Sequence, residues 1–151
     1  MAVQRDDPYG AFNFKVTITP GSGGEIRAGF SDVSGLGTEV TYADYRVGTD
    51  PANHPRKVPL MHKASDVTLK RGLAGGLDLF QWIDQVRQGK QDAKATVMIE
   101  LMSEDRSAVV LGWKLSGARP SKFTGPTLAA KGGTDVAMEE LVLVCEDIGM
   151  E

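Results

Sequence analysis

Apolar and polar residues alternate along most of the chain, and this pattern predicts strands. The clearest run is residues 11–19, where Phe12, Phe14, Val16 and Ile18 are separated by polar residues. A period of two is typical of a strand with one buried face. Further strands are predicted at residues 25–33, 38–47, 65–70, 94–102, 109–115 and 134–146. We expect the first two runs to form a hairpin across the glycine-rich turn at residues 20–24.

One segment, residues 77–88, repeats at helical spacing instead. Asp78 in its first turn and Arg87 in its last both suit the helix dipole, and Gly89 is a natural stop. An amphipathic helix needs a surface to cover, so we expect it to pack on the strands. The predicted packing stripe is Leu77, Phe80, Ile83 and Val86. Trp82 lies off this stripe, and we expect it to pack at the helix edge or to contact another protein.

Two segments lack any period and are predicted to be irregular. Residues 48–63 contain Pro51, Pro55 and Pro59 and are interpreted as a long loop. A loop of this length in a small domain is commonly functional. Residues 118–133, with two prolines and two adjacent glycines, are also expected to be irregular. The last strand is apolar on both faces at residues 141–145, so one face needs a cover from the helix, a loop or another subunit.

Length and charge narrow the function classes. With 151 residues the chain is expected to form one domain, residues 1–151, and its net charge of −3 argues against a duplex nucleic-acid binder. No secretory signal or bilayer-length apolar run is seen, so we expect synthesis and assembly in the cytoplasm without a membrane anchor. Cys145 is the single cysteine, which excludes an internal disulfide.

Candidate chemistry is weak throughout. His54 and His62 have no nearby ligand partners, so a metal site is not expected, and Cys145 has no neighbouring base. The glycines at 21–24 lack the lysine of a phosphate loop. Glu139 and Glu140 point to opposite strand faces, so one of them should be buried, paired or at an interface. We expect no enzyme activity and no cofactor.

The motifs taken in order resemble the tube proteins of contractile tails, found in phages and in phage-tail-like extracellular injection particles. The match begins with Asp-Pro-Tyr at residues 7–9 and the Phe-x-Phe-x-Val-x-Ile run. It continues through residues 29–36, 45–48 and 69–72, then Leu79, Trp82 and Gly89. Trp113, Pro120, residues 125–126 and residues 139–143 complete it. One departure is Val-Pro-Leu at residues 58–60, where the family often has Leu-Pro-Gly.

The resemblance implies a mainly β fold, a small two-sheet β-barrel with one flanking helix. Six copies would form a ring, and rings would stack into a tube whose lumen conducts DNA or a protein effector. Implied partners are further copies of the chain, a sheath protein, baseplate or spike proteins and a tail terminator. The particle would be a phage tail or a related device that is released from the cell.

Residue predictions and alternatives follow from these points. Contacts between subunits or rings are expected at Pro51, His54, Arg56, Pro59, Val142 and Val144. A polar lumen lining is expected at Glu39, Thr41, Thr96 and Glu100. Three alternatives stay open: an adaptor at the tube tip, the ring protein of type VI secretion, and a monomeric ligand-binding barrel.

Overall fold

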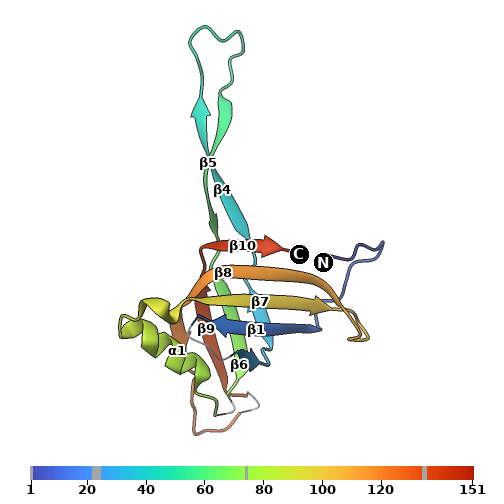
Figure 1. The fold of residues 1–151 in the computed structure, drawn as a ribbon, viewed down its shortest axis with the longest axis vertical. Coiled ribbons are helices and arrows are strands. Elements are labelled where there is room, and N and C mark those ends of the chain that lie inside the picture. The colour runs from blue at the N-terminus through green and yellow to red at the C-terminus, as the bar shows by residue number, and fades with distance from the viewer. Residues whose placement is uncertain (1, 22–24, 74, 134–135) are drawn as a thin grey trace.

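The computed structural model describes residues 2–21, 25–73, 75–133 and 136–151, and within them strands dominate (Figure 1). One α-helix, α1 (Asp78–Arg87), is followed by a 3-10 turn, η1 (Gln91–Ala93). The strands are β1 (Phe14–Pro20), β2 (Ile26–Ala28), β3 (Asp32–Ser34), β4 (Thr38–Tyr45), β5 (Arg56–Ala64), β6 (Val67–Gly72), β7 (Ala95–Met102), β8 (Val109–Thr124), β9 (Met138–Val144) and β10 (Asp147–Met150).

Eight of these strands form one bent antiparallel sheet with the order β2-β1-β7-β8-β9-β6-β3, in which β10 also pairs with β8. The bend lies in the 16-residue strand β8. Its first part pairs with β7 and β10, and its second part, from Arg119 to Thr124, pairs with β9. The two halves thereby enclose one core. The mainly β prediction with a single helix is confirmed for the described residues. Within these residues the order of paired strands ends at β2 on one side and β3 on the other, so the sheet is not closed into a barrel by hydrogen bonds.

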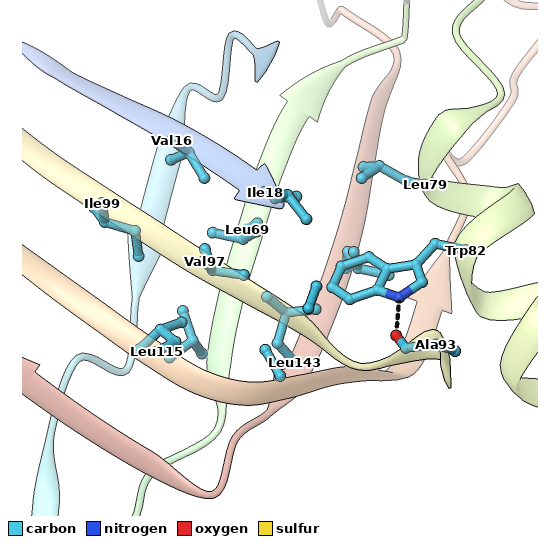
Figure 2. Close-up of a cluster of buried hydrophobic side chains, with 14 residues drawn as sticks. Val16, Ile18, Leu69, Leu79, Trp82, Ala93, Val97, Ile99, Leu115 and Leu143 are labelled. Carbon is cyan, nitrogen blue, oxygen red and sulfur yellow. Dashed lines mark hydrogen bonds between the residues drawn. The ribbon is translucent and has the colours of Figure 1, made fainter. Parts of the chain in front are cut away.

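The core is made by the alternating apolar residues of both halves (Figure 2). In β1, β6, β7 and β9 the buried residues are two apart, as a one-sided period of two requires, whereas Leu115 and Ala118 in β8 are three apart. The strand residues of this buried cluster are Val16, Ile18, Ala95, Val97, Ile99, Leu115 and Ala118 from one half, and Val67, Leu69, Leu141 and Leu143 from the other. Burial of side chains of this size contributes ~1.5–3 kcal/mol each, so this cluster is the main source of stability.

The helix covers the core with a different face from the predicted one. Leu79 and Trp82 are buried, whereas Leu77 is 64% and Phe80 46% exposed. Of the predicted stripe, Val86 packs against the core and Ile83 is half-buried. Two causes explain the error. Leu77 is the N-cap residue and lies outside the helix. In addition, apolar residues occur on two adjacent faces of the helix, so spacing alone did not decide which face is buried. The face with the larger side chain, Trp82, is the one that packs on the core.

Trp82 is therefore a core residue and not an edge or partner contact. Its indole N–H donates a hydrogen bond to the carbonyl oxygen of Ala93 in η1, at 2.7 Å (Figure 2). A buried indole N–H needs such a partner. Phe80 remains partly exposed and its ring packs edge to face on Phe123 of β8, with the centroids 5.7 Å apart.

Three other segment predictions are corrected. Residues 25–33 do not form one strand: β2 pairs with β1 as the expected hairpin, but β3 pairs with β6. Residues 118–124, predicted irregular, continue β8. The second half of residues 48–63, predicted to be a loop, belongs to β5, which pairs with β4. The turn at residues 22–24 lies outside the described residues.

Candidate assembly surfaces

The hairpin of β4 and β5 projects away from the body along the long axis of the molecule (Figure 1). Its strands pair only with each other, from Thr38 opposite Ala64 at the base to Tyr45 opposite Arg56 near the tip. Alternation places Val40 and Tyr42 on one face of the ribbon and Val58 and Tyr45 on the other. All four of these side chains are exposed. The hairpin thus carries apolar side chains on both faces without a core to bury them.

An isolated two-stranded hairpin is marginally stable in water, and grouped exposed apolar side chains mark interaction sites. The most exposed part lies at a β-bulge, where Leu60 and Met61 are both opposite Thr41. Met61 is 84% and Leu60 54% exposed. A bulge redirects side chains and twists the ribbon. We therefore identify the hairpin, residues 38–64, as the first candidate assembly surface.

The hairpin tip is held by polar contacts within residues 46–56. The Arg46 guanidinium donates to the carbonyl oxygens of Ala52 at 3.0 Å and Asp50 at 3.2 Å. The Asp50 carboxylate accepts a hydrogen bond from the Ala52 N–H and lies 3.9 Å from Arg56. These contacts order the chain reversal and leave its outer surface free.

The structure brings four of the six predicted contact residues together on this hairpin. Pro51 and His54 are exposed at the tip, and Arg56 and Pro59 lie on β5. Pro59 has no N–H to donate, and it is tolerated because β5 has a paired strand on one side only. This proline obscured the strand in the sequence. The signal that could have revealed β5 was β4, because its β-branched residues predict a strand and a strand must pair with another.

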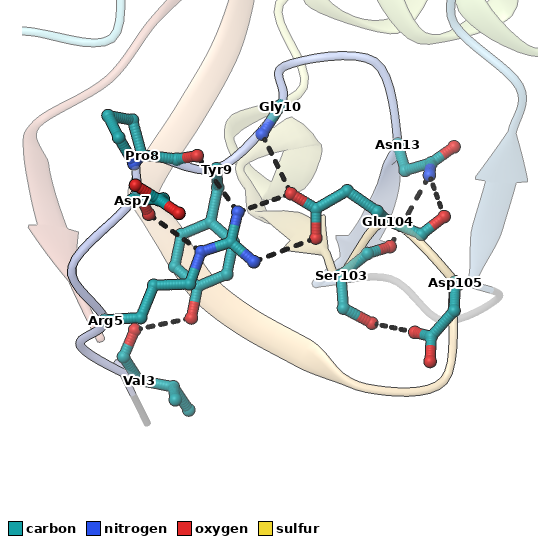
Figure 3. A network of polar contacts seen from close by, with 10 residues as sticks. All are labelled: Val3, Arg5, Asp7, Pro8, Tyr9, Gly10, Asn13, Ser103, Glu104 and Asp105. Carbon is teal, nitrogen blue, oxygen red and sulfur yellow. Dashed lines mark hydrogen bonds and ion pairs between the residues drawn. The ribbon is translucent and has the colours of Figure 1, made fainter.

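A second cluster fixes the N-terminal arm, residues 2–12, to the turn between β7 and β8 (Figure 3). Arg5 donates to the Glu104 carboxylate through both terminal nitrogens, one bond being 3.0 Å, and to the carbonyl oxygens of Asp7 and Pro8. The guanidinium also stacks 3.9 Å from the centre of the Tyr9 ring. The hydrogen bond from Arg5 lowers the pKa of Glu104 from 4.5 to about 2. No periodicity pointed to this ion pair, since its members are 99 residues apart.

A third cluster is built on Arg71 of β6, which joins the sheet to the start of the helix. Arg71 pairs with Glu139 of β9 and donates to Asp78 of α1 at 2.6 Å. Glu139 is buried, as the opposite-face argument for Glu139 and Glu140 predicted. Hydrogen bonding to Arg71 lowers the pKa of Asp78. This cluster joins β6, β9 and α1 and so stabilises the fold.

The predicted lumen residues fall on two separate surfaces. Glu39 and Thr41 lie on β4 in the hairpin, whereas Thr96 and Glu100 lie on β7. In β7 the alternate residues Val97 and Ile99 are buried, so Thr96 and Glu100 belong to the outward face of the body sheet. The Glu100 carboxylate is 3.7 Å from the ammonium group of Lys15 on the neighbouring strand.

The remaining predicted residues flank the body. Val142 is half-buried and Val144 is 40% exposed, so the final strand is only partly covered on its second face. Cys145 packs against the core, and burial raises the pKa of its thiol.

His54 and His62 are exposed. Among the described residues no group of three or more His, Cys, Asp or Glu is placed to bind a metal ion. In the same part of the chain no helix has the length and apolarity to cross a membrane.

A folded β-body with an apolar hairpin exposed in the single chain has the features of a structural protein that assembles through that hairpin. The comparison with known families agrees with this class. The chain belongs to the family of the T4-like virus tail tube protein gp19, whose model matches residues 10–149. This match confirms the resemblance to contractile-tail tube proteins.

Solved structures extend the comparison. The chain is 25% identical to one in the sheath-tube complex of an extracellular contractile injection system, PVC, in its extended state. The TM-score is 0.81, with 95% of this chain and 91% of the other covered. A chain in the anti-feeding prophage cap, described as a tube terminating cap, matches at 25% identity and TM-score 0.83, covering 100% and 95%. Hcp1 from Flavobacterium johnsoniae shares the fold at 15% identity and TM-score 0.51, covering 90% and 94%. A search among curated proteins found no significant match.

Proposed function

We propose that this chain is the subunit of the inner tube of a contractile tail or injection particle, in which six copies form a ring and the rings stack. The observation that carries the proposal is the hairpin, residues 38–64, whose apolar side chains are exposed in the single chain. Ordering and covering this hairpin requires another surface, and further copies of the chain supply one at high local concentration. The tail tube family and the sheath-tube structure support the same role.

The partners follow from this role. The proposed tube lies inside a sheath protein and is bounded by baseplate or spike proteins at one end and a terminator at the other. Sheath-tube and tube-cap structures among the similar proteins support these partners. We propose assembly in the bacterial cytoplasm as part of a phage tail or of an extracellular particle. The function is mechanical conduction of cargo, DNA or a protein effector, without catalysis.

The outward face of β1, β7 and β8 is the proposed lumen lining. It presents Lys15 paired with Glu100, together with Thr17, Thr96, Met98 and Lys114, so it is mainly polar and carries few charges. A strongly basic lining would retain nucleic acid by counterion release, whereas a neutral one lets cargo slide. Glu39 and Thr41 contribute only if the hairpin base also faces the lumen. A reconstruction that places the outward face of β7 on the outside of the tube would contradict this assignment.

The direct experiment is negative-stain electron microscopy of the purified chain over a range of concentrations. A main tube subunit is expected to give rings with six-fold symmetry and stacks of rings. Single rings that stack only after addition of baseplate components would instead indicate the tip adaptor. A monomer at high concentration that forms no assembly with baseplate components would refute the proposal.

A further inference from the structure

The N-terminal arm, residues 2–12, covers an apolar part of the body without filling the space beneath it. A pocket of about 180 Å³ lies between the arm and the body. The arm contributes Tyr9 and Ala11 to its lining, and the body contributes uncharged side chains that include Phe14, Leu101 and Trp113. Atoms beside an unfilled space lack the contacts that close packing would give them. Apolar packing therefore holds the arm only weakly.

The larger apolar side chains of the arm do not add to this packing. Phe12 is 69% and Val3 51% exposed, and neither lines the pocket. The Phe12 ring lies against Gly10 instead, where an added Cβ atom would come 2.5 Å from its Cε1 atom. The position of the arm thus depends mainly on polar contacts.

Arg5 is the centre of these polar contacts. Its guanidinium binds two carbonyl oxygens within the arm and joins the arm to the Glu104 carboxylate of the body (Figure 3). The side chains of Arg5 and Glu104 are 36% and 45% exposed. Exposed ion pairs are weak and are screened by salt. A backbone hydrogen bond from Val3 to Val110, at 2.8 Å, adds to the hold. The arm can therefore be released without disturbing the core.

We propose that the arm is a reversible cover that restrains self-association of the free subunit. While Arg5 holds the arm closed, Phe14, Leu101 and Trp113 lie partly buried beneath it. Opening the arm exposes them, and exposed apolar surface drives association. The hairpin is exposed at all times, so control of assembly has to act at another surface. This proposal rests on the proposed function, because it adds control over when assembly starts.

Acrylamide quenching of tryptophan fluorescence reports whether the arm is open. Trp82 is 3% exposed, so a change in quenching comes from Trp113 beneath the arm. Arg5→Gln removes the ion pair with Glu104. The matched control, Lys94→Gln, removes the same charge from another exposed ion pair, with Glu146 at 2.6 Å. We expect stronger quenching in Arg5→Gln alone, and quenching of the unmodified chain should rise with salt towards that level.

Light scattering during assembly measures the restraint. Assembly of Arg5→Gln should be about two- to fivefold faster than that of the unmodified chain, the range expected for loss of one exposed ion pair. Lys94→Gln should assemble at the rate of the unmodified chain, since its ion pair does not hold the arm.

Stronger quenching together with faster assembly in Arg5→Gln, and neither change in Lys94→Gln, supports the proposal. Unchanged quenching would show that Arg5 does not hold the arm, and unchanged or slower assembly would show that the arm does not restrain association. Either result overturns the proposal and leaves the proposed function intact. If Arg5→Gln does not fold, Glu104→Gln is measured by the same criteria. A chain that forms no rings, with or without the substitution, refutes the proposed function itself.

Discussion

At the scale of single residues, the structure depends on one partly buried cation. The Arg71 side chain is only 12% exposed and lies between Glu139, 4% exposed, and Asp78, 33% exposed. It therefore ties β6 and β9 to the first turn of the helix. The neighbouring register position holds a second pair, Lys70 and Glu140, at 4.0 Å and largely in solvent. The sequence predicted that one of the two glutamates would be buried, paired or at an interface, but the identity of its partner required the strand register.

Removal of one member of the buried pair should be costly. We expect Glu139→Ala to lower the free energy of unfolding by about 3–5 kcal/mol, because it leaves a buried guanidinium with one carboxylate fewer. Glu140→Ala, the matched control one position along, should cost about 0–1 kcal/mol. Urea denaturation followed by circular dichroism measures both. Equal losses for the two variants would show that burial does not distinguish the pairs.

The ion pair of Arg5 and Glu104 makes docking of the arm pH-dependent. The pKa of Glu104 in the folded chain is lowered to about 2, so ionisation favours the docked arm above the ordinary pKa of 4.5. This contribution is lost as the pH falls from 4.5 through about 2. An NMR titration of the Glu104 carboxyl carbon should show the low pKa. In Arg5→Ala the pKa should rise towards its ordinary value, and an unchanged pKa would mean that Arg5 is not the cause.

At the scale of elements, the sequence predicted what depends on local pattern. Strands with one buried face, such as β1 and β7, and the existence of α1 were evident from period alone. The choice of helix face was not, because it depends on which side chain fills the core. Strand β5 was missed because its residues are exposed on both faces and no burial pattern is imposed on it. Because neither face of β5 is buried within the chain, its sequence carries little periodic signal.

The corrected helix face predicts a clear pair of variants. Trp82→Ala should lower the free energy of unfolding by about 3–5 kcal/mol, because it opens a cavity and leaves the Ala93 carbonyl without its donor. Leu77→Ala, at the exposed N-cap, should change it by about 0.5 kcal/mol or less. Thermal or urea denaturation reports both. A larger loss of stability in Leu77→Ala than in Trp82→Ala would show that the originally predicted face of the helix packs on the core.

The hairpin predicts a separation of folding from assembly. The double variant Leu60→Ser and Met61→Ser should keep the circular dichroism spectrum and melting behaviour of the body, since neither side chain belongs to the core. It should no longer form tubes in electron micrographs, because the apolar contact is lost. Leu77→Ser removes a comparably exposed leucine outside the hairpin and should still assemble. Normal tubes from the double variant would exclude the bulge as an assembly contact.

At the scale of the whole molecule, the family match over residues 10–149 and the exposed apolar hairpin indicate a subunit of a larger assembly rather than a protein that acts as a monomer. Ordered motifs allowed the family to be predicted from the sequence, because they mark turns and strand pairings along nearly the entire chain. The surfaces that meet in an assembly could be assigned only to a region. The shape of the candidate assembly surface, a projecting ribbon, arises from long-range strand pairing that no local motif encodes.

Native mass spectrometry of the purified chain tests the central claim, self-association into six-membered rings, most directly. The account predicts a species at six times the 16.2 kDa subunit mass, with multiples of that ring at higher concentration. Hairpin variants should shift the population to lower oligomers. A spectrum that contains only the 16.2 kDa chain at all accessible concentrations, or a ring with another number of subunits, would contradict the account.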